Sequence, residues 1–294
     1  MKIGMIVPSF KQKGPIIVAG LIAKGIRKID KSHDFVFVSL RKNDEEDSAW
    51  LTNSLDNGVK YYELGMGKLP TKRVLTDIIQ IAKNEKIDIL HSHSYWPTVI
   101  TAKVNEIKKI ITVHEETKTS LEYDYGVIIA QMFIKKFLGS LRKYQKTVFV
   151  SETVRNHILS LQKYEENLKD CDVILNGVED SYRKPTVPNE INNKTVAFAS
   201  FSVLNKRKNI ILALKAFTNL KRQHIKSFKY DIYGSGPELN DLIEYSERND
   251  LAENINFKGM IARNEVLRAI PNYDVVIMPS LSEGLSLAAI EAQM

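Results

Sequence analysis

Two carboxylates eight residues apart give this chain its strongest chemical signal. Glu283 lies in a short loop after the apolar run Val275–Met278, and Glu291 follows in an apolar stretch that predicts a helix starting near Gly284. The first turn of such a helix presents unbonded backbone N–H groups and a partial positive charge. The segment therefore predicts an anion site, with Glu283 at the helix mouth and Glu291 about two turns along its flank.

Further candidates for chemistry lie elsewhere in the chain. Lys208 belongs to the basic segment Asn205–Asn209, which is either part of a phosphate site or a solvated helix start. His114 follows an apolar strand, where it either contacts a ligand or is satisfied locally. His91 and His93 are two residues apart and so share one face of a strand, as metal ligands or residues lining a cleft would.

The elements that must position these residues alternate between short β-branched runs and longer amphipathic stretches. This rhythm predicts βα units around parallel sheets, with the loops after the strands gathered at one ligand-binding edge. We expect strands at Ile3–Val7, Phe35–Ser39, Val59–Glu63, Ile87–His91, Lys109–Val113, Thr147–Val150, Asp172–Leu175, Thr195–Ser200, Phe228–Tyr233, Ile255–Phe257 and Val275–Met278.

A polar segment with two prolines, Ser181–Glu190, interrupts this rhythm before it restarts at Thr195. Such a composition is typical of a domain boundary. The sequence therefore predicts an α/β fold with two Rossmann-like domains, residues 1–180 and 195–294, joined by a linker at residues 181–194.

With these elements placed, the motifs together resemble those of family-4 glycosyltransferases, which have the two-domain GT-B fold. The resemblance extends along the whole chain, and any one motif alone would be weak. Its elements are Glu283-x7-Glu291, the turn Gly234-Ser235-Gly236-Pro237, the segment Asn254–Gly259, Asn176-Gly177-Val178 and the strand-to-serine turn Val148–Ser151.

The resemblance assigns roles to particular residues. In the donor domain it implies that Glu291 holds the ribose hydroxyls of a nucleotide sugar and that Lys208 neutralises the diphosphate. It also implies that Glu283 holds the donor sugar together with the backbone N–H groups of three residues. Those three residues are Leu285, Ser286 and Leu287.

In the first domain, the resemblance makes His114 the catalytic candidate, acting on the transferred sugar or the acceptor, and Glu283 its counterpart in the second domain. His93 is expected to line the acceptor side. Gly14 matches a glycine-rich loop in which backbone amides approach the ligand, although the family usually has two glycines there. The family also has an arginine where this chain has Ser202, so a neighbouring cation, Lys206 or Arg207, is expected to substitute in part.

Composition excludes several classes of protein. No apolar run reaches the roughly 18 residues of a membrane span, and the net charge of +7 is not gathered into the basic stripe of a nucleic-acid binder. The one cysteine, Cys171, fits a reducing cytoplasm. The segment Gln131–Tyr144 combines an apolar face with cations. It could rest on an anionic membrane at the inner face, or it could be a core-facing helix with a basic outer side.

The sequence therefore predicts a retaining, metal-independent enzyme with no cofactor beyond its nucleotide-diphosphate sugar. We expect it to transfer a hexose or N-acetylhexosamine to a glycan or lipid-linked acceptor. The resemblance implies about two further βα units beyond Met294, so the second domain is expected to be incomplete. Two alternatives stay open: a catalytically silent nucleotide-sugar-binding subunit that supports a partner glycosyltransferase, and a nucleotide-sugar isomerase. The aspartates of Asp170-Cys171-Asp172 spell the D-x-D of metal-dependent glycosyltransferases but lie outside a donor-site context.

Overall fold

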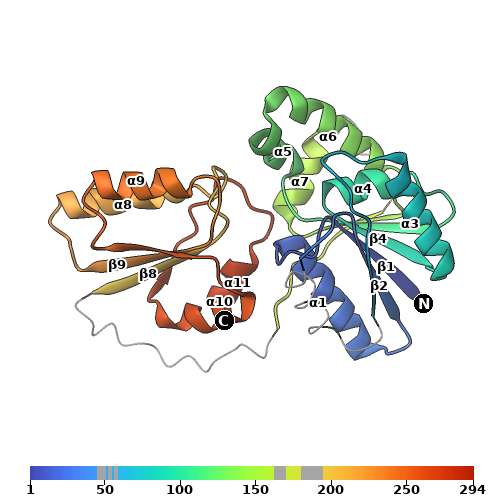
Figure 1. Cartoon of the computed structure of the whole chain (residues 1–294), viewed down its shortest axis with the longest axis horizontal. Helices are drawn as coiled ribbons and strands as arrows, with labels where there is room; N and C mark the ends of the chain where they lie inside the picture. The colour runs from blue at the N-terminus through green and yellow to red at the C-terminus, as the bar shows by residue number, and fades with distance from the viewer. Residues whose placement is uncertain (45–50, 52–54, 56–58, 162–169, 180–194) are drawn as a thin grey trace. The chain divides into compact units, whose positions relative to one another are not determined.

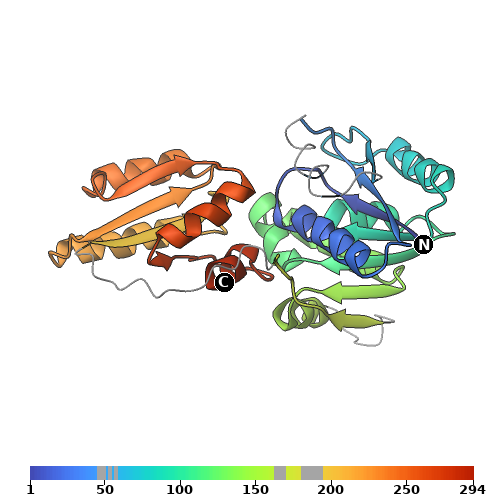
Figure 2. The same ribbon diagram turned by 90° about the horizontal axis from the view of Figure 1, so that it is seen from below.

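A computed structural model describes residues 1–44, 51, 55, 59–161, 170–179 and 195–294 of the chain. It divides into two compact units, Met1–Gly177 and Val178–Met294. Each unit has its own parallel sheet and its own helices, as the two views in Figure 1 and Figure 2 show. The predicted linker, residues 181–194, lies outside the described residues.

The first unit is built on a seven-stranded parallel sheet with the order β3-β2-β1-β4-β5-β6-β7. Its strands are β1 Lys2–Val7, β2 Asp34–Ser39, β3 Lys60–Glu63, β4 Ile89–His93, β5 Lys108–Val113, β6 Lys146–Phe149 and β7 Cys171–Val173. Its helices are α1 Gly14–Ile29, α3 Lys72–Asn84, α4 Tyr95–Thr101, α5 Thr117–Tyr125, α6 Val127–Leu141 and α7 Glu152–Leu161. The strand order reverses between β1 and β4, and ligands bind at such switch points in doubly wound sheets.

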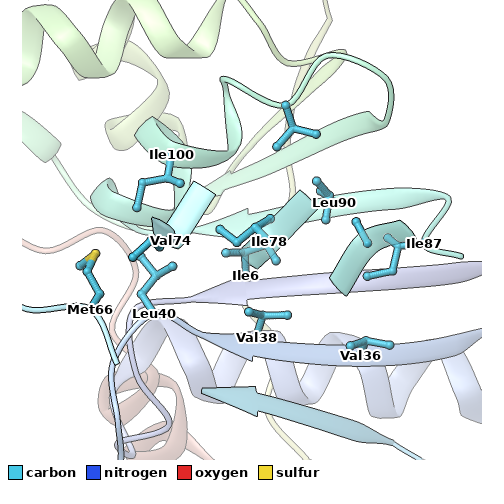
Figure 3. Close-up of a cluster of buried hydrophobic side chains, with 12 residues drawn as sticks. Ile6, Val36, Val38, Leu40, Met66, Val74, Ile78, Ile87, Leu90 and Ile100 are labelled. Carbon is cyan, nitrogen blue, oxygen red and sulfur yellow. The ribbon is translucent and has the colours of Figure 1, made fainter. Parts of the chain in front are cut away.

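Helices cover both faces of this sheet because side chains alternate along each strand. Met5 and Phe37 face the side that α1 covers with Ile16 and Ala19. Ile6, Val36, Val38 and Leu90 face the other side, where α3 and α4 contribute Val74, Ile78 and Ile100, as Figure 3 shows. Near-continuous apolar runs are what a sheet buried on both faces requires.

The second unit has a four-stranded parallel sheet with the order β10-β9-β8-β11. Its strands are β8 Val196–Phe201, β9 Phe228–Tyr233, β10 Ile255–Gly259 and β11 Val275–Val276. Its helices are α8 Ile210–Arg222, α9 Leu239–Arg248, α10 Arg263–Ala269, a 3-10 turn at Ile270–Asn272 and α11 Leu287–Gln293. The core joins α8 and α9 to β9 through side chains such as Phe217, Leu242 and Tyr230. The order reverses between β8 and β11, so the loops after these two strands flank the switch point.

All eleven predicted strands overlap a strand of the described chain, but several predicted bounds are off by one or two residues; the strand predicted at Asp172–Leu175, for example, ends at Val173. Ile87, expected to open β4, instead bonds through its N–H to the carbonyl of Ala82 at 2.9 Å. Lys86 before it has a φ of 54°, so the two residues close α3 in a Schellman arrangement. The run Val275–Met278 forms only a two-residue strand, because Ile277 N–H bonds to Ala199 and the chain then turns away.

Candidate active site

The two loops at the switch point of the second sheet are joined by backbone and side-chain hydrogen bonds. The N–H of Leu281 donates to the carbonyl of Arg207 at 2.8 Å, and the side-chain amide of Asn209 donates to the carbonyl of Pro279 at 3.3 Å. Asn209 has a φ of 53°, a left-handed conformation that asparagine tolerates better than most residues. These bonds hold the basic segment against the loop that carries Glu283.

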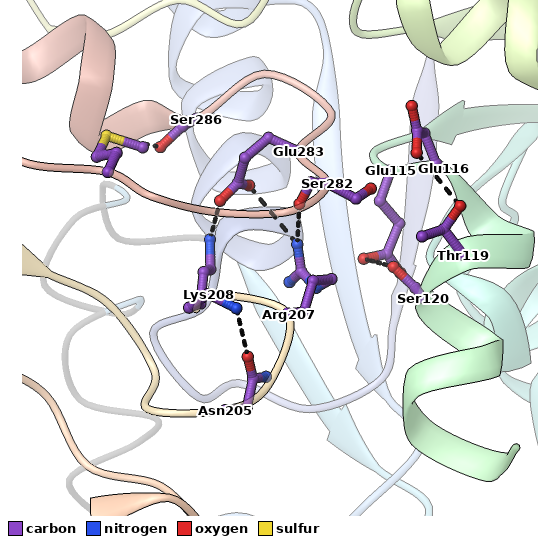
Figure 4. Close-up of polar contacts among 11 residues, drawn as sticks. Glu115, Glu116, Thr119, Ser120, Asn205, Arg207, Lys208, Ser282, Glu283 and Ser286 are labelled. Atoms are coloured by element: carbon purple, nitrogen blue, oxygen red, sulfur yellow. Dashed lines mark hydrogen bonds and ion pairs between the residues drawn. The ribbon is translucent and has the colours of Figure 1, made fainter. Parts of the chain in front are cut away.

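Three charged side chains meet between these loops, as Figure 4 shows. The Lys208 ammonium donates to Oε1 of Glu283, and a guanidinium nitrogen of Arg207 lies 3.6 Å from Oε2 of the same carboxylate. Arg207 also donates to the carbonyl of Ser282 at 2.9 Å. The side chains of Lys208, Arg207 and Glu283 are only 16%, 19% and 27% exposed, so their charges are held in place. Two cations and one carboxylate leave the cluster with a net positive charge.

A glycine turn supports the same edge of the sheet. Gly234 has a φ of 131°, and a Cβ there would lie 1.8 Å from the carbonyl oxygen of Ser202. A Cβ on Gly236 would lie 2.2 Å from the carbonyl oxygen of Leu204. Leu204 N–H in turn donates to Ser235 at 2.9 Å. Positions 234 and 236 of the turn must therefore be glycines, because the loop after β8 passes directly over them.

The helix after Glu283 begins later than the sequence predicts. Helix α11 starts at Leu287, not near Gly284, and Ser286 before it has an extended backbone with φ −73° and ψ 121°. Ser286 directs its hydroxyl to the sulfur of Met278 at 3.8 Å. Leu285 and Ser286 consequently belong to the loop, and only Leu287 of the three predicted amide donors lies in the helix.

Glu291 is the fifth residue of α11, a little over one turn from its start instead of two. Its side chain is 3% exposed and accepts a hydrogen bond from the guanidinium of Arg263, at the start of α10. Burial raises the pKa of this carboxyl above its usual value, and the charge of Arg263 opposes that rise. Glu291 is therefore neither solvated nor unpaired in the ligand-free protein.

In the first unit, three histidines lie side by side near the ends of β4 and β5. The rings of His91 and His93 are 4.4 Å apart, and those of His93 and His114 are 5.1 Å apart. Nδ1 of His93 lies 2.9 Å from Nε2 of His114, and Nε2 of His91 lies 2.9 Å from the hydroxyl of Thr112. His93 is fully buried, whereas His114 is partly exposed beyond the strand end.

Burial keeps all three rings neutral at physiological pH. It lowers the pKa of His91 to about 4 and that of His114 to about 3, with a further repulsive contribution from His91 on His114. The pKa of His93 lies well below its usual value for the same reasons. Each ring therefore carries one proton, and each can both donate and accept one hydrogen bond.

Gly14 does not occupy a glycine-requiring backbone conformation. It is the first residue of α1, with Pro15 second and Lys13 as the N-cap. A Cβ on Gly14 would meet no atom within 4 Å, so neither backbone strain nor packing in the described chain demands a glycine at this position. The absence of a side chain leaves open space at the start of a sixteen-residue helix beside the β1/β4 switch point.

The loop after β5 that carries His114 is held to α5 by short side-chain contacts. The hydroxyl of Ser120 donates to Glu115 at 2.7 Å, and that of Thr119 donates to Glu116 at 3.2 Å, as drawn in Figure 4. These contacts fix the chain immediately after His114.

No group of three His, Cys, Asp or Glu side chains converges as a metal site would require within the residues that the structure describes. The three histidine rings lie in a row, and Asp170 and Asp172 each pair with Lys146 at 2.6 Å. The same part of the chain holds no helix that is long and apolar enough to cross a membrane.

Comparisons with known families and structures agree with this geometry. Residues 19–182 match Glycosyltransferase Family 4, and residues 183–294 match Glycosyl transferases group 1. The chain belongs to glycosyltransferase family 4. The chain is therefore a glycosyltransferase with the GT-B fold, and both predictions from the sequence are confirmed.

Three relatives illustrate the range of this glycosyltransferase family. The chain is 25% identical to the O-antigen biosynthesis glycosyltransferase WclY of Escherichia coli, over 99% of this chain and 77% of the relative. It is 27% identical to the alpha-monoglucosyldiacylglycerol synthase of Streptococcus pneumoniae, over 75% of this chain and 53% of the relative. The crystal structure of Anabaena Alr3699/HepE in complex with UDP and glucose has the same fold. It aligns with a TM-score of 0.79 and 16% identity, over 99% of this chain and 78% of that one.

Two contacts in this glycosyltransferase were not anticipated from the sequence. Arg263 pairs with Glu291 from 28 positions away, and the first turn of α10 gives no sign of this role. His93 bonds directly to His114, although the sequence predicts for it only a place on the acceptor side. The register of β4 on β5, with His93 opposite Thr112, could have indicated this proximity, since His114 lies two residues further on.

Proposed function

We propose that the second unit binds a nucleotide-diphosphate sugar between the Lys208 loop and the start of α11. We further propose that the enzyme transfers the sugar with retention of anomeric configuration and without a metal ion. The observation that carries the proposal is the pairing of Lys208 and Arg207 with Glu283. Two largely buried cations with one carboxylate between them form a site that suits an incoming diphosphate, because the cluster has a net positive charge that attracts an anion.

In the proposed step, the bond from the anomeric carbon to the β-phosphate oxygen breaks while an acceptor hydroxyl attacks from the same face. The hydroxyl proton passes to the departing phosphate oxygen, so no protein nucleophile is needed. Negative charge grows on the leaving diphosphate as the sugar becomes oxocarbenium-like. Lys208 and Arg207 would stabilise that charge, and cations fixed before the reaction act strongly in such a role.

The remaining residues take the roles that the family resemblance implies. Glu291 would accept hydrogen bonds from the ribose hydroxyls, since one carboxylate can serve both hydroxyls of a vicinal diol. Glu283 and the backbone of Leu285, Ser286 and Leu287 would contact the donor sugar and diphosphate. The loop geometry of Leu285 and Ser286 means that any amide they offer comes from a loop and not from a helix start.

In the first unit, His114 would contact the transferred sugar or the acceptor through its exposed edge. His93 would support it from within the core, and the open space at Gly14 would admit part of the ligand. The roles proposed for the first unit are tested by activity, whereas the donor site of the second unit can be tested by binding alone.

The experiment that tests this proposal is a thermal-shift screen of the full chain with uridine, guanosine and adenosine diphosphate sugars, followed by transfer assays. A bound donor raises the melting temperature through its binding free energy. We expect the sugars of one nucleotide to stabilise the protein more than those of the other two. Sugar transfer should continue when a metal chelator is added, and the product should keep the donor's anomeric configuration. Specific binding without turnover in any assay would instead select the silent subunit. No binding of any nucleotide sugar would refute the donor site.

We propose in addition that the acceptor is lipid-linked and that α6 rests on an anionic membrane surface. Helix α6 buries Ala130, Ile134 and Phe137, as a core-facing helix does. The opposite face is apolar at its start, where Ile128 is 83% and Met132 is 63% exposed. Exposed cations follow at Lys135 and Lys136 on the same face, and at Arg142 and Lys143 just after the helix ends. The streptococcal relative is named as the synthase of a glucosylated diacylglycerol, and this supports a lipid acceptor.

The membrane proposal is tested with vesicles of anionic phosphatidylglycerol and of neutral phosphatidylcholine. We expect the chain to bind the anionic vesicles, to dissociate as salt rises, and to lose binding when Ile128 and Met132 are both replaced by serine. Leu212, which is 52% exposed on α8 of the other unit, provides the matched control as Leu212→Ser. Equal binding by the double variant and the control would remove α6 from the membrane surface.

A further inference from the structure

The three neutral histidines leave one question of chemistry open, namely which ring nitrogens carry the protons. We infer that His93 is a positioning residue whose Nδ1–H donates to Nε2 of His114. His114 is thereby fixed as a hydrogen-bond donor, through Nδ1, toward the bound sugar or acceptor. The inference rests on the proposed function of His114, and the proton position itself can be measured without any assay of activity.

The environment of His93 decides which of the two rings donates. Its Nε2 is buried and has no hydrogen-bond partner among the described residues, while its Nδ1 lies 2.9 Å from His114. If His114 were the donor, the proton of His93 would have to sit on Nε2, as an N–H buried without an acceptor. Buried N–H groups without a partner are rare in native proteins, because their desolvation is not repaid. The proton of His93 therefore lies on Nδ1, where it has an acceptor.

The proton position in His93 determines that in His114. A neutral His114 that accepts at Nε2 must carry its own proton on Nδ1. That nitrogen has no partner in the described part of the chain and is not among its enclosed unpartnered atoms, so it is available to a ligand. His114 thus presents an N–H to a hydroxyl or phosphate oxygen. In this state it cannot act through Nδ1 as a general base.

His91 supports the arrangement from the other side. The centre of its ring lies 4.4 Å from that of His93, with the two planes tilted by 35°, and its Nε2 lies 2.9 Å from the hydroxyl of Thr112. His93 is consequently enclosed between two rings, and rotation of its imidazole would break the bond to His114. The contacts from His91 to His93 and from His93 to His114 fix the orientation of the His114 ring. No charged side chain is needed as a partner.

The test is the ¹⁵N spectrum of histidine-labelled full-length enzyme, in which protonated and unprotonated ring nitrogens have well-separated chemical shifts. We expect Nδ1 to be protonated in both His93 and His114. His93→Asn keeps a side-chain N–H near the original position and should leave the His114 pattern and kcat within about threefold of the wild type. His93→Leu removes the donor, so His114 should lose its fixed Nδ1–H form and kcat should fall about tenfold or more, with little change in the donor KM.

Tyr144→Phe is the matched control, because Tyr144 is a buried residue that bonds to Ser92 of the same strand at 3.0 Å. It should alter stability without changing the His114 spectrum. Protonation of Nε2 in wild-type His114 would overturn the inference, as would a His93→Leu variant with the wild-type spectrum and kcat. Correct proton positions in an enzyme with no transfer activity would instead count against the proposed function alone.

Discussion

The ammonium group of Lys208 donates a hydrogen bond to the carboxylate of Glu283, although 75 positions separate the two residues in the chain. The bond spans the switch point of the second sheet, where the loops after β8 and β11 meet. Arg207 lies against the same carboxylate, and neither cation is more than one-fifth exposed. The proposed donor site is thus assembled before any ligand binds, and this gives its variants definite expected effects.

Replacing Lys208 by glutamine should lower kcat/KM for the nucleotide sugar by about 100-fold, because it removes one preorganised group that stabilises the leaving diphosphate. Steady-state kinetics on the full chain measure this effect. Arg248→Gln is the matched control, since Arg248 forms an exposed pair with Glu244 on α9 and should change activity by less than twofold, in line with the small effects of surface pairs. Equal kinetics for the two variants would exclude Lys208 from the site.

Glu291→Gln should weaken donor binding and, at the same time, raise the thermal stability of the ligand-free protein. Burial raises the pKa of Glu291 in the folded state, so the folded protein favours the neutral form of this group. Its contribution to stability is present below the unfolded pKa and is lost as the pH rises through the folded pKa. The stability advantage of the glutamine variant should therefore grow as the pH rises above about 4.5, the ordinary pKa of a glutamate.

Melting curves of both proteins across this pH range check the expectation. A variant that is less stable than the wild type, by the same margin at every pH, would show that Glu291 is held for stability. That result would contradict the proposal that Glu291 binds the ribose although its carboxylate destabilises the ligand-free protein.

For Glu85, beside the edge strand β3 of the first sheet, we expect the opposite dependence of stability on pH. It accepts hydrogen bonds from Lys60 at 2.8 Å and Tyr62 at 2.6 Å, which lower its pKa to about 2. A carboxyl with a lowered folded pKa stabilises the protein above its unfolded pKa, and that contribution is lost as the pH falls from about 4.5 toward 2. Glu85→Gln should be less stable than the wild type at pH 7, and the two should converge in acid.

Denaturant unfolding at several pH values measures the difference for Glu85→Gln. Glu106→Gln, at an exposed position of the same unit, serves as the control and should follow the wild type throughout. A constant difference between Glu85→Gln and the wild type down to pH 2 would contradict the assigned pKa.

Gly234→Ala should lower the free energy of unfolding of the second unit by about 2–4 kcal/mol, because the new Cβ meets the carbonyl of Ser202 and the residue must keep a positive φ. Gly139→Ala is the control, since Gly139 lies inside α6, where an added methyl group would meet no side chain within 4 Å. That change should raise stability by about 0.5–1 kcal/mol. Similar melting temperatures for the two variants would show that the loop after β8 moves aside.

Features that depend on residues close together in the sequence could be predicted from it, whereas contacts between distant residues could not. The strands follow from local β-branched runs between helical stretches, and all eleven predicted strands overlap those of the described chain. The topology rule places the loops after the strands at one edge of each sheet. The resemblance assigned both Lys208 and Glu283 to the donor site, but the ion pair between them was not predicted. The family motifs supplied the residue identities.

Other features depend on contacts that the sequence does not display. Helix α11 starts at Leu287 and not near Gly284, and the loop before it is bonded to a distant segment through the N–H of Leu281 and the carbonyl of Arg207. The partner of Glu291 comes from α10, a helix with no motif of its own. The bond between His93 and His114 depends on the register of β4 against β5, and a shift of one residue would have turned the two rings to opposite faces.

The most direct test of the donor site is a crystal structure of the full chain with a bound nucleoside diphosphate. We expect a diphosphate oxygen within about 3 Å of Lys208 or Arg207 and the ribose hydroxyls on the carboxylate of Glu291. A nucleotide bound elsewhere, or bound with Glu291 still enclosed by Arg263 and both cations still committed to Glu283, would contradict the account.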